Sequence, residues 1–214
     1  MLPPAQRTLW PKLAELPEHF VLYGGTAIAL RCGHRISEDF DFFSAQALVP
    51  EALLARVPWL WSPKPTVLQR QDNTLTLQLG NEMGSVKASF FGGIEFGQIN
   101  PPERAADNQL KVASPEDLLA LKLGVIQQRV EAKDYLDIHA LLKSGLSLPV
   151  GLSHLDALHP LTTNWTITLK TLVYFKGGDL EALPDPVKRD LEEAVRLVRT
   201  VPKFAGFTTP LGSG

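Results

Sequence analysis

The sequence predicts an α/β (α+β) protein with a mixed β-sheet flanked by helices in its N-terminal half and a helical C-terminal half. Short apolar or alternating segments fill residues 20–91, whereas apolar residues recur at helical spacing from residue 114 onward. The length of 214 residues suits one domain or a domain with a smaller appendage. We place the α/β core at residues 1–110 and a helical region packed on it at residues 111–214.

Short strands and short helices alternate in the first half. Leu75, Leu77 and Leu79 share one face of a predicted hairpin whose turn is Asp72-Asn73. The expected helices cover residues 4–16, 26–32 and 50–57, and the expected strands cover 20–23, 40–43, 66–71, 74–79 and 85–91.

A clear helix start opens the second half. Ser114 is a suitable cap, Pro115 fits the first helical position, and the two acids that follow suit the positive end of a helix. Helices are expected at 114–128, 131–143, 165–175 and 186–200, and the terminal Pro-Leu-Gly-Ser-Gly is expected to be loose.

Composition restricts the class of protein. The net charge of −2 argues against a chain that binds nucleic acid over its whole surface, although a local basic groove is compatible with it. The single cysteine, Cys32, allows no intrachain disulfide. No secretory signal and no apolar run of membrane-spanning length is recognised. We therefore expect a cytoplasmic protein with no membrane partner.

A glycine pair lies where a strand runs into a helix. Gly24 and Gly25 let the backbone approach a ligand, and the N–H groups of the following helix, from Thr26, favour phosphate. A tight strand-to-helix turn without a ligand explains the same residues.

Two carboxylates follow at strand spacing. Asp39 and Asp41 point to one side of an extended chain, while Phe40 and Phe42 point into the core. Such carboxylates repel each other unless a cation lies between them, and Mg²⁺ prefers oxygen ligands of this kind. The alternative is an acidic edge strand that faces water.

A hydroxyl and a guanidinium lie beside the acid pair. Ser37 continues the alternation of Asp39 and Asp41, so we expect all three on one face. Arg35 and Ser37 suit the remaining phosphates of a triphosphate. A surface ion pair of Arg35 with Glu38 or Asp39 is the alternative.

The helical half adds one lysine and two acids. Lys122 falls inside an apolar stripe, where it either reaches a triphosphate or extends along the edge of the core to water. Asp134 and Asp137 lie close together on the next helix, and one of them could pair with Lys122 or act as a base. Surface carboxylates matched to Arg129 or Lys133 are the alternative.

Taken together, these motifs resemble the AbiEii/AbiGii-type nucleotidyltransferase toxins of the DNA polymerase β-like superfamily. The resemblance covers residues 20–43 and 115–142, through Gly-Gly-Thr-Ala at 24–27, Arg-Ile-Ser-Glu-Asp-Phe-Asp-Phe at 35–42, Lys122 and Lys-Asp-Tyr-Leu-Asp-Ile at 133–138. It implies the nucleotidyltransferase fold and an enzyme that uses a nucleoside triphosphate with Mg²⁺. It also implies a tRNA or protein acceptor and a cognate antitoxin.

The resemblance assigns roles by position. Asp39 and Asp41 would hold Mg²⁺, and Gly24, Gly25 and Ser37 would contact phosphate. Lys122 would bind the triphosphate, and Asp137, with Asp134 near it, would serve the acceptor.

One departure concerns a third carboxylate, which the superfamily often carries on a neighbouring strand. Ser89 occupies that position in this chain. Three functions stay open: an active transferase, a degenerate fold that binds a nucleotide or partner without turnover, and an enzyme that modifies a small polycationic molecule.

Overall fold

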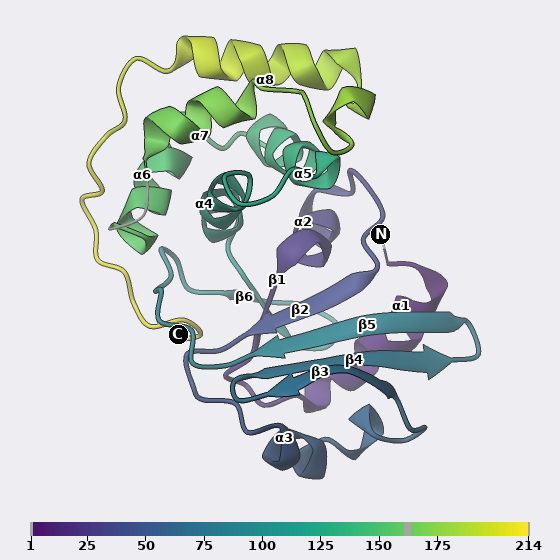
Figure 1. Ribbon diagram of the computed structural model, residues 1–214. Helices are drawn as coiled ribbons and strands as arrows, with labels where there is room; N and C mark the ends of the chain where they lie inside the picture. The colour runs from purple at the N-terminus through teal and green to yellow at the C-terminus, as the bar shows by residue number, and fades with distance from the viewer. Residues whose placement is uncertain (1, 161–163, 214) are drawn as a thin grey trace. The chain divides into compact units, whose positions relative to one another are not determined.

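The computed structural model describes residues 2–160 and 164–213, which form two compact units (Figure 1). Unit 1 contains the residues up to Ser114 together with those from Thr209 onward, and unit 2 contains residues 115–208. The division falls a few residues later than the expected position near 110, because strand β7 (Lys111–Val112) still belongs to the sheet of unit 1.

Unit 1 is built on a seven-stranded mixed sheet with the order β3-β4-β5-β2-β1-β7-β6 (Figure 1). β2 is parallel to β5 and β1 is parallel to β7, whereas the other neighbours are antiparallel. The remaining strands are β1 (Val21–Tyr23), β2 (Asp39–Phe43), β3 (Thr66–Gln71), β4 (Thr74–Asn81), β5 (Gly84–Phe91) and β6 (Glu103–Arg104).

Aromatic side chains form the core on one face of this sheet. Phe40 and Phe42 are fully buried, and the ring of Phe42 stacks on that of Phe90 with centroids 5.0 Å apart. The ring of Trp10 lies 6.3 Å from that of Phe40. The helices of unit 1 are α1 (Pro4–Leu9), α2 (Gly24–Cys32) and α3 (Pro50–Arg56), with 3₁₀ turns at Trp10–Glu15 and Pro58–Leu60. The burial of alternate residues on β2 confirms the predicted inward side of that strand.

The end of the described chain is held by side chains of unit 1. Gln98 is buried, its Nε2 donates to the carbonyl of Ser213 at 2.7 Å, and its Oε1 accepts from the N–H of Gly212 at 2.8 Å. Lys111 Nζ donates to the carbonyl of Gly212, and Thr209 pairs with Gln98 through the backbone. The expectation of a loose C-terminal segment is therefore wrong for residues 210–213, and its last residue, Gly214, lies outside the described residues.

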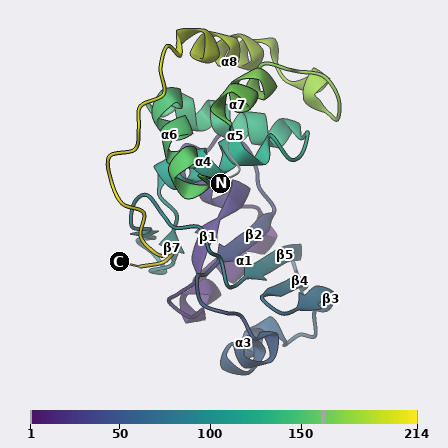
Figure 2. The ribbon, with the colours of Figure 1, turned by 60° about the vertical axis from the view of Figure 1, so that its left-hand side comes forward.

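Unit 2 is helical (Figure 2). Its helices are α4 (Pro115–Val125), α5 (Ala132–Lys143), α6 (Leu148–Leu158), α7 (Trp165–Leu172) and α8 (Asp185–Leu197), with a 3₁₀ turn at Leu180–Ala182. Four of the helices confirm the predicted segments, and α6 was not predicted. The mixed sheet and the helices confirm the predicted fold class. Within the described residues, no helix has the length and apolar character that crossing a membrane requires.

Candidate active site

The start of α2 lies against a carboxylate of β2. Gly24 has φ +70°, and a Cβ at this position would lie 2.5 Å from Oδ2 of Asp41. Only glycine combines this backbone conformation with so close an approach. Tyr23, the residue before the helix, gives no side-chain cap to the first turn of α2. The first N–H groups of a helix favour an anion, and a helix start is a usual place for an anion site.

The second glycine faces the guanidinium and hydroxyl that the sequence placed in the site. A Cβ at Gly25 would overlap Nη2 of Arg35 and would lie 2.9 Å from Oγ of Ser37. Nη1 of Arg35 donates to the carbonyl of Ile36 at 3.0 Å. Arg35 and Ser37 thus lie at the start of α2, so a guanidinium, a hydroxyl and backbone N–H groups converge there.

Thr26 has a structural contact in this arrangement. Its side chain is buried, and its hydroxyl donates a short hydrogen bond to the backbone carbonyl of Asp39. The hydroxyl therefore ties α2 to the first residue of β2, and a role for Thr26 in binding phosphate would fall to its backbone N–H.

Asp39 and Asp41 project from the face of β2 opposite to the buried phenylalanines, and both are partly exposed. β2 lies between β5 and β1, so the alternative of an acidic edge strand is wrong. The strand is fixed by neighbours on both sides, which holds the two carboxylates at the spacing of one strand repeat.

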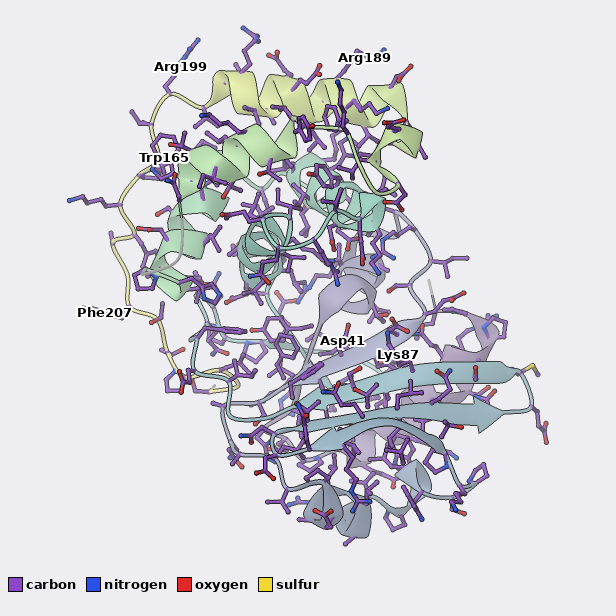
Figure 3. All side chains as sticks on the ribbon, viewed as in Figure 1. Asp41, Lys87, Trp165, Arg189, Arg199 and Phe207 are labelled. Atoms are coloured by element: carbon purple, nitrogen blue, oxygen red, sulfur yellow. The ribbon has the colours of Figure 1, made fainter. Side chains whose placement is uncertain are left out.

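Strand β5 adds a lysine that the sequence analysis missed. Asp39 is paired with Lys87 and Asp41 with Ser89 across the two strands. Nζ of Lys87 lies 2.7 Å from Oδ2 of Asp39, and both side chains are about two-fifths exposed, at 38% and 40%. Figure 3 labels Lys87 and Asp41 on these adjacent strands. The strand pairing is not visible in the sequence, although Lys87 and Ser89 share the polar side of the segment 85–91.

The donor set fits a single divalent ion that prefers oxygen. Among the described residues, no group of three or more His, Cys, Asp or Glu side chains could hold a metal. Asp39 and Asp41 are two carboxylates on one face, and Mg²⁺ is commonly held by one or two carboxylates plus waters and substrate phosphates. The absence of an acid at Ser89 is therefore compatible with such an ion.

An open groove elsewhere in unit 1 contains none of the predicted site residues. It has a volume of about 960 Å³ and lies beside α1, the C-terminal part of α2, and β6. Trp10, Arg31 and Arg104 are among its lining residues, and Arg31 is paired with Glu103 at 2.9 Å.

A second group of charged residues forms inside unit 2. Nζ of Lys122 lies 2.6 Å from Oδ1 of Asp134 and 2.7 Å from Oδ2 of Asp137. Both carboxylates are fully buried, and Lys122 is 7% exposed. The predicted pairing of Lys122 with an acid of the next helix is thus confirmed. The alternatives of surface carboxylates and of a lysine that extends to water are wrong.

Arg129 completes this group. Its Nε and Nη2 donate to the two oxygens of Asp134 at 2.8 and 2.9 Å. Burial is the largest influence on the pKa of Asp134 and raises it, but the hydrogen bonds and charges of Arg129 and Lys122 together outweigh burial. The pKa of Asp134 is therefore held below its usual value. The ionised carboxylate of Asp134 therefore stabilises the fold fully at a pH above the pKa that this group has in the unfolded chain. That stabilisation is lost as the pH falls through the pKa of Asp134 in the folded protein.

Comparison with known proteins identifies the family. Residues 9–200 match the family described as the nucleotidyl transferase AbiEii toxin of a type IV TA system. The chain belongs to the AbiEii nucleotidyltransferase toxin family. It is accordingly a nucleotidyltransferase, as the sequence motifs indicated. It is also 31% identical to an uncharacterized protein of Aquifex aeolicus (strain VF5), over 81% of this chain and 83% of that protein.

Solved structures show the same fold. A nucleotidyltransferase toxin of Mycobacterium tuberculosis, MenT4, superposes with a TM-score of 0.58 at 15% identity, over 90% of this chain and 83% of that one. A structure from H. pylori that is described as a nucleotidyltransferase gives a TM-score of 0.56 at 19% identity, over 90% and 91%. At these identities the likeness establishes the nucleotidyltransferase fold.

Proposed function

We propose that this member of the family transfers a nucleoside monophosphate from a nucleoside triphosphate to a hydroxyl of an RNA or protein acceptor, with Mg²⁺ held by Asp39 and Asp41. The main support is the convergence at the start of α2. There, Gly24 lies against Asp41, and Gly25 lies against Arg35 and Ser37. The carboxylates that would hold the metal and the groups that would bind phosphate come from one unit, which supports the proposal.

The residues of unit 1 have complementary tasks in this reaction. The N–H groups of α2, the hydroxyl of Ser37 and the guanidinium of Arg35 bind and orient the phosphates. When bound, the divalent ion would supply positive charge that neutralises the negative charge developing on the oxygens around the reacting phosphorus. The acceptor oxygen forms a bond to the α-phosphorus while the bond to the bridging oxygen breaks. Pyrophosphate leaves with that oxygen, and the hydroxyl proton is lost to a base or to water.

The roles of the unit 2 residues follow from the family resemblance and stay predictions. In these predicted roles, Lys122 binds the triphosphate, and Asp137 and Asp134 act on the acceptor. The buried ion pairs of these side chains equally support a purely structural role, and the two roles differ in their consequences for nucleotide affinity.

Transfer is tested by incubating the protein and Mg²⁺ with each of the four triphosphates labelled at the α-phosphorus, together with total RNA or lysate proteins. We expect label to enter one class of acceptor. Asp39→Ala should reduce labelling by at least about a hundredfold, because the metal then lacks a ligand. Asp72→Asn, which changes an exposed acid of the β3–β4 turn, should label like the wild type. Equal labelling by Asp39→Ala would refute the proposal.

The position of Ser89 favours one second candidate, a fold that binds a nucleotide without turnover. The hydroxyl beside Asp41 replaces the acid that often completes a two-ion site. Calorimetry that shows triphosphate binding, together with no release of pyrophosphate in the presence of any acceptor, would support this candidate. Release of pyrophosphate would exclude it.

Toxins of this family are expected to act together with an antitoxin. We propose that a cognate antitoxin opposes the activity of this chain in the cell. Expression of the wild type alone should then arrest growth, whereas Asp39→Ala should not, because arrest would depend on transfer.

A further inference from the structure

We propose that Lys87 is a positioning residue that acts as a built-in cation at the carboxylate pair, and that the site, in which Ser89 stands in place of a third acid, takes one divalent ion instead of two. The inference rests on the proposed metal-binding role of Asp39 and Asp41. It adds a residue that neither the motifs nor the family assignment identified.

The strand register brings Lys87 to the site. In a sheet, laterally paired residues project to the same face, so Lys87 and Ser89 of β5 share the face of Asp39 and Asp41. The ammonium lies 2.7 Å from Oδ2 of Asp39, which is the length of a charge-assisted hydrogen bond. Strand β5 therefore presents a cation and a neutral hydroxyl beside the two acids.

The net charge of the site favours the binding of one divalent ion over two. Two carboxylates and one ammonium sum to a charge of −1, and the guanidinium of Arg35 at the adjoining start of α2 adds a further positive charge, so a single divalent ion more than balances the acids. A two-ion site holds its metals roughly 4 Å apart and needs carboxylates to bridge them. Here no further acid joins the pair to make a group of three within the described residues, and one oxygen of Asp39 is already ion-paired with Lys87. A second dication at that oxygen would be repelled by the ammonium.

The ion pair also restrains the ligand. Because Nζ of Lys87 lies against Oδ2 of Asp39, the ammonium limits how that carboxylate can rotate toward an ion shared with Asp41. Lys87 acts through Asp39, so its effect should appear in metal binding before any transfer takes place.

The test is a titration of the nucleotide-free protein with Mn²⁺, in which unbound Mn²⁺ is measured by electron paramagnetic resonance. We expect the wild type to bind one ion at the site, and Asp41→Asn to lose it. Lys87→Met should bind one ion about tenfold more tightly, because the competing positive charge is gone. Lys87→Met combined with Ser89→Asp should bind two ions, because a third carboxylate becomes available.

Two controls separate charge from fold. Lys87→Arg keeps the cation and should retain the wild-type affinity, whereas Lys64→Met removes an exposed lysine of the loop before β3 and should change nothing. The inference is overturned if the wild type binds two ions, or if Lys87→Met, with an unchanged circular dichroism spectrum, binds Mn²⁺ no more tightly. Wild-type binding that survives Asp41→Asn would instead overturn the proposed metal site.

Discussion

Replacing Lys122 with Met should destabilise unit 2 severely. Met keeps the length and helix preference of lysine but removes the ammonium that lies 2.6 and 2.7 Å from two fully buried carboxylates. Removing one partner from a buried ion pair typically costs about 3–5 kcal/mol, because the other charge stays buried. Arg129 still binds Asp134 through two hydrogen bonds, so the loss falls mainly on Asp137 and we expect the lower end, about 3 kcal/mol.

Urea unfolding followed by circular dichroism measures this loss. A cost of about 3 kcal/mol in a unit of this size corresponds to a fall in Tm of more than about 10 °C. Lys170→Met is the matched control, because Lys170 is exposed on α7 of the same unit, and it should change stability by less than about 0.5 kcal/mol. Adding Asp137→Asn to Lys122→Met should restore part of the loss, since the uncompensated charge is then removed.

A Lys122→Met protein as stable as the control would refute this reasoning. It would mean that the buried carboxylates tolerate the loss of the ammonium, and that the only role of Lys122 is to bind the triphosphate. The affinity of the folded variant for a triphosphate tests the predicted phosphate role separately. A loss of stability with unchanged affinity would assign the lysine to structure.

Three further predictions concern other parts of the molecule. Gly24→Ala should weaken Mn²⁺ and triphosphate binding in titrations, since its Cβ would meet Oδ2 of Asp41, and the left-handed backbone should add about 1–2 kcal/mol of destabilisation. Burial lowers the pKa of His154 despite nearby acids, and its buried Nδ1 has no hydrogen-bond partner among the described residues. The folded protein should therefore lose stability as the pH falls below the unfolded value near 6.5, and in thermal unfolding at pH 7.5 and 5.5 His154→Phe should lose less. Gln98→Ala removes two hydrogen bonds to the C-terminal segment and should cost about 1–2 kcal/mol, with faster hydrogen exchange in residues 209–213.

Much of the site in unit 1 was predictable because it depends on local geometry. The alternation of Asp39 and Asp41 with two phenylalanines fixes which side faces the core, and both phenylalanines are fully buried. The positions of Arg35 and Ser37 at the start of α2 also follow from a short connection. Lys87 was missed because its position depends on which strands pair, and β2 pairs with β5 across more than forty intervening residues.

The missed elements have a different cause, which is that tertiary packing overrides local preference. α6 contains Gly151 in its interior, which disfavours a helix prediction. Gly151 is needed because a Cβ there would lie 2.7 Å from a methyl carbon of Leu119 on α4. The C-terminal segment likewise looked unstructured, because the side chains that hold it, Gln98 and Lys111, lie about a hundred residues earlier.

The return of the chain to unit 1 has a consequence for biosynthesis. The carbonyl and N–H groups that Gln98 binds belong to residues 212 and 213, so they emerge from the ribosome only after every helix of unit 2 has been made. During translation, Gln98 therefore stays without these contacts until the helices of unit 2 have been made, and a nascent chain halted in the helical region lacks them.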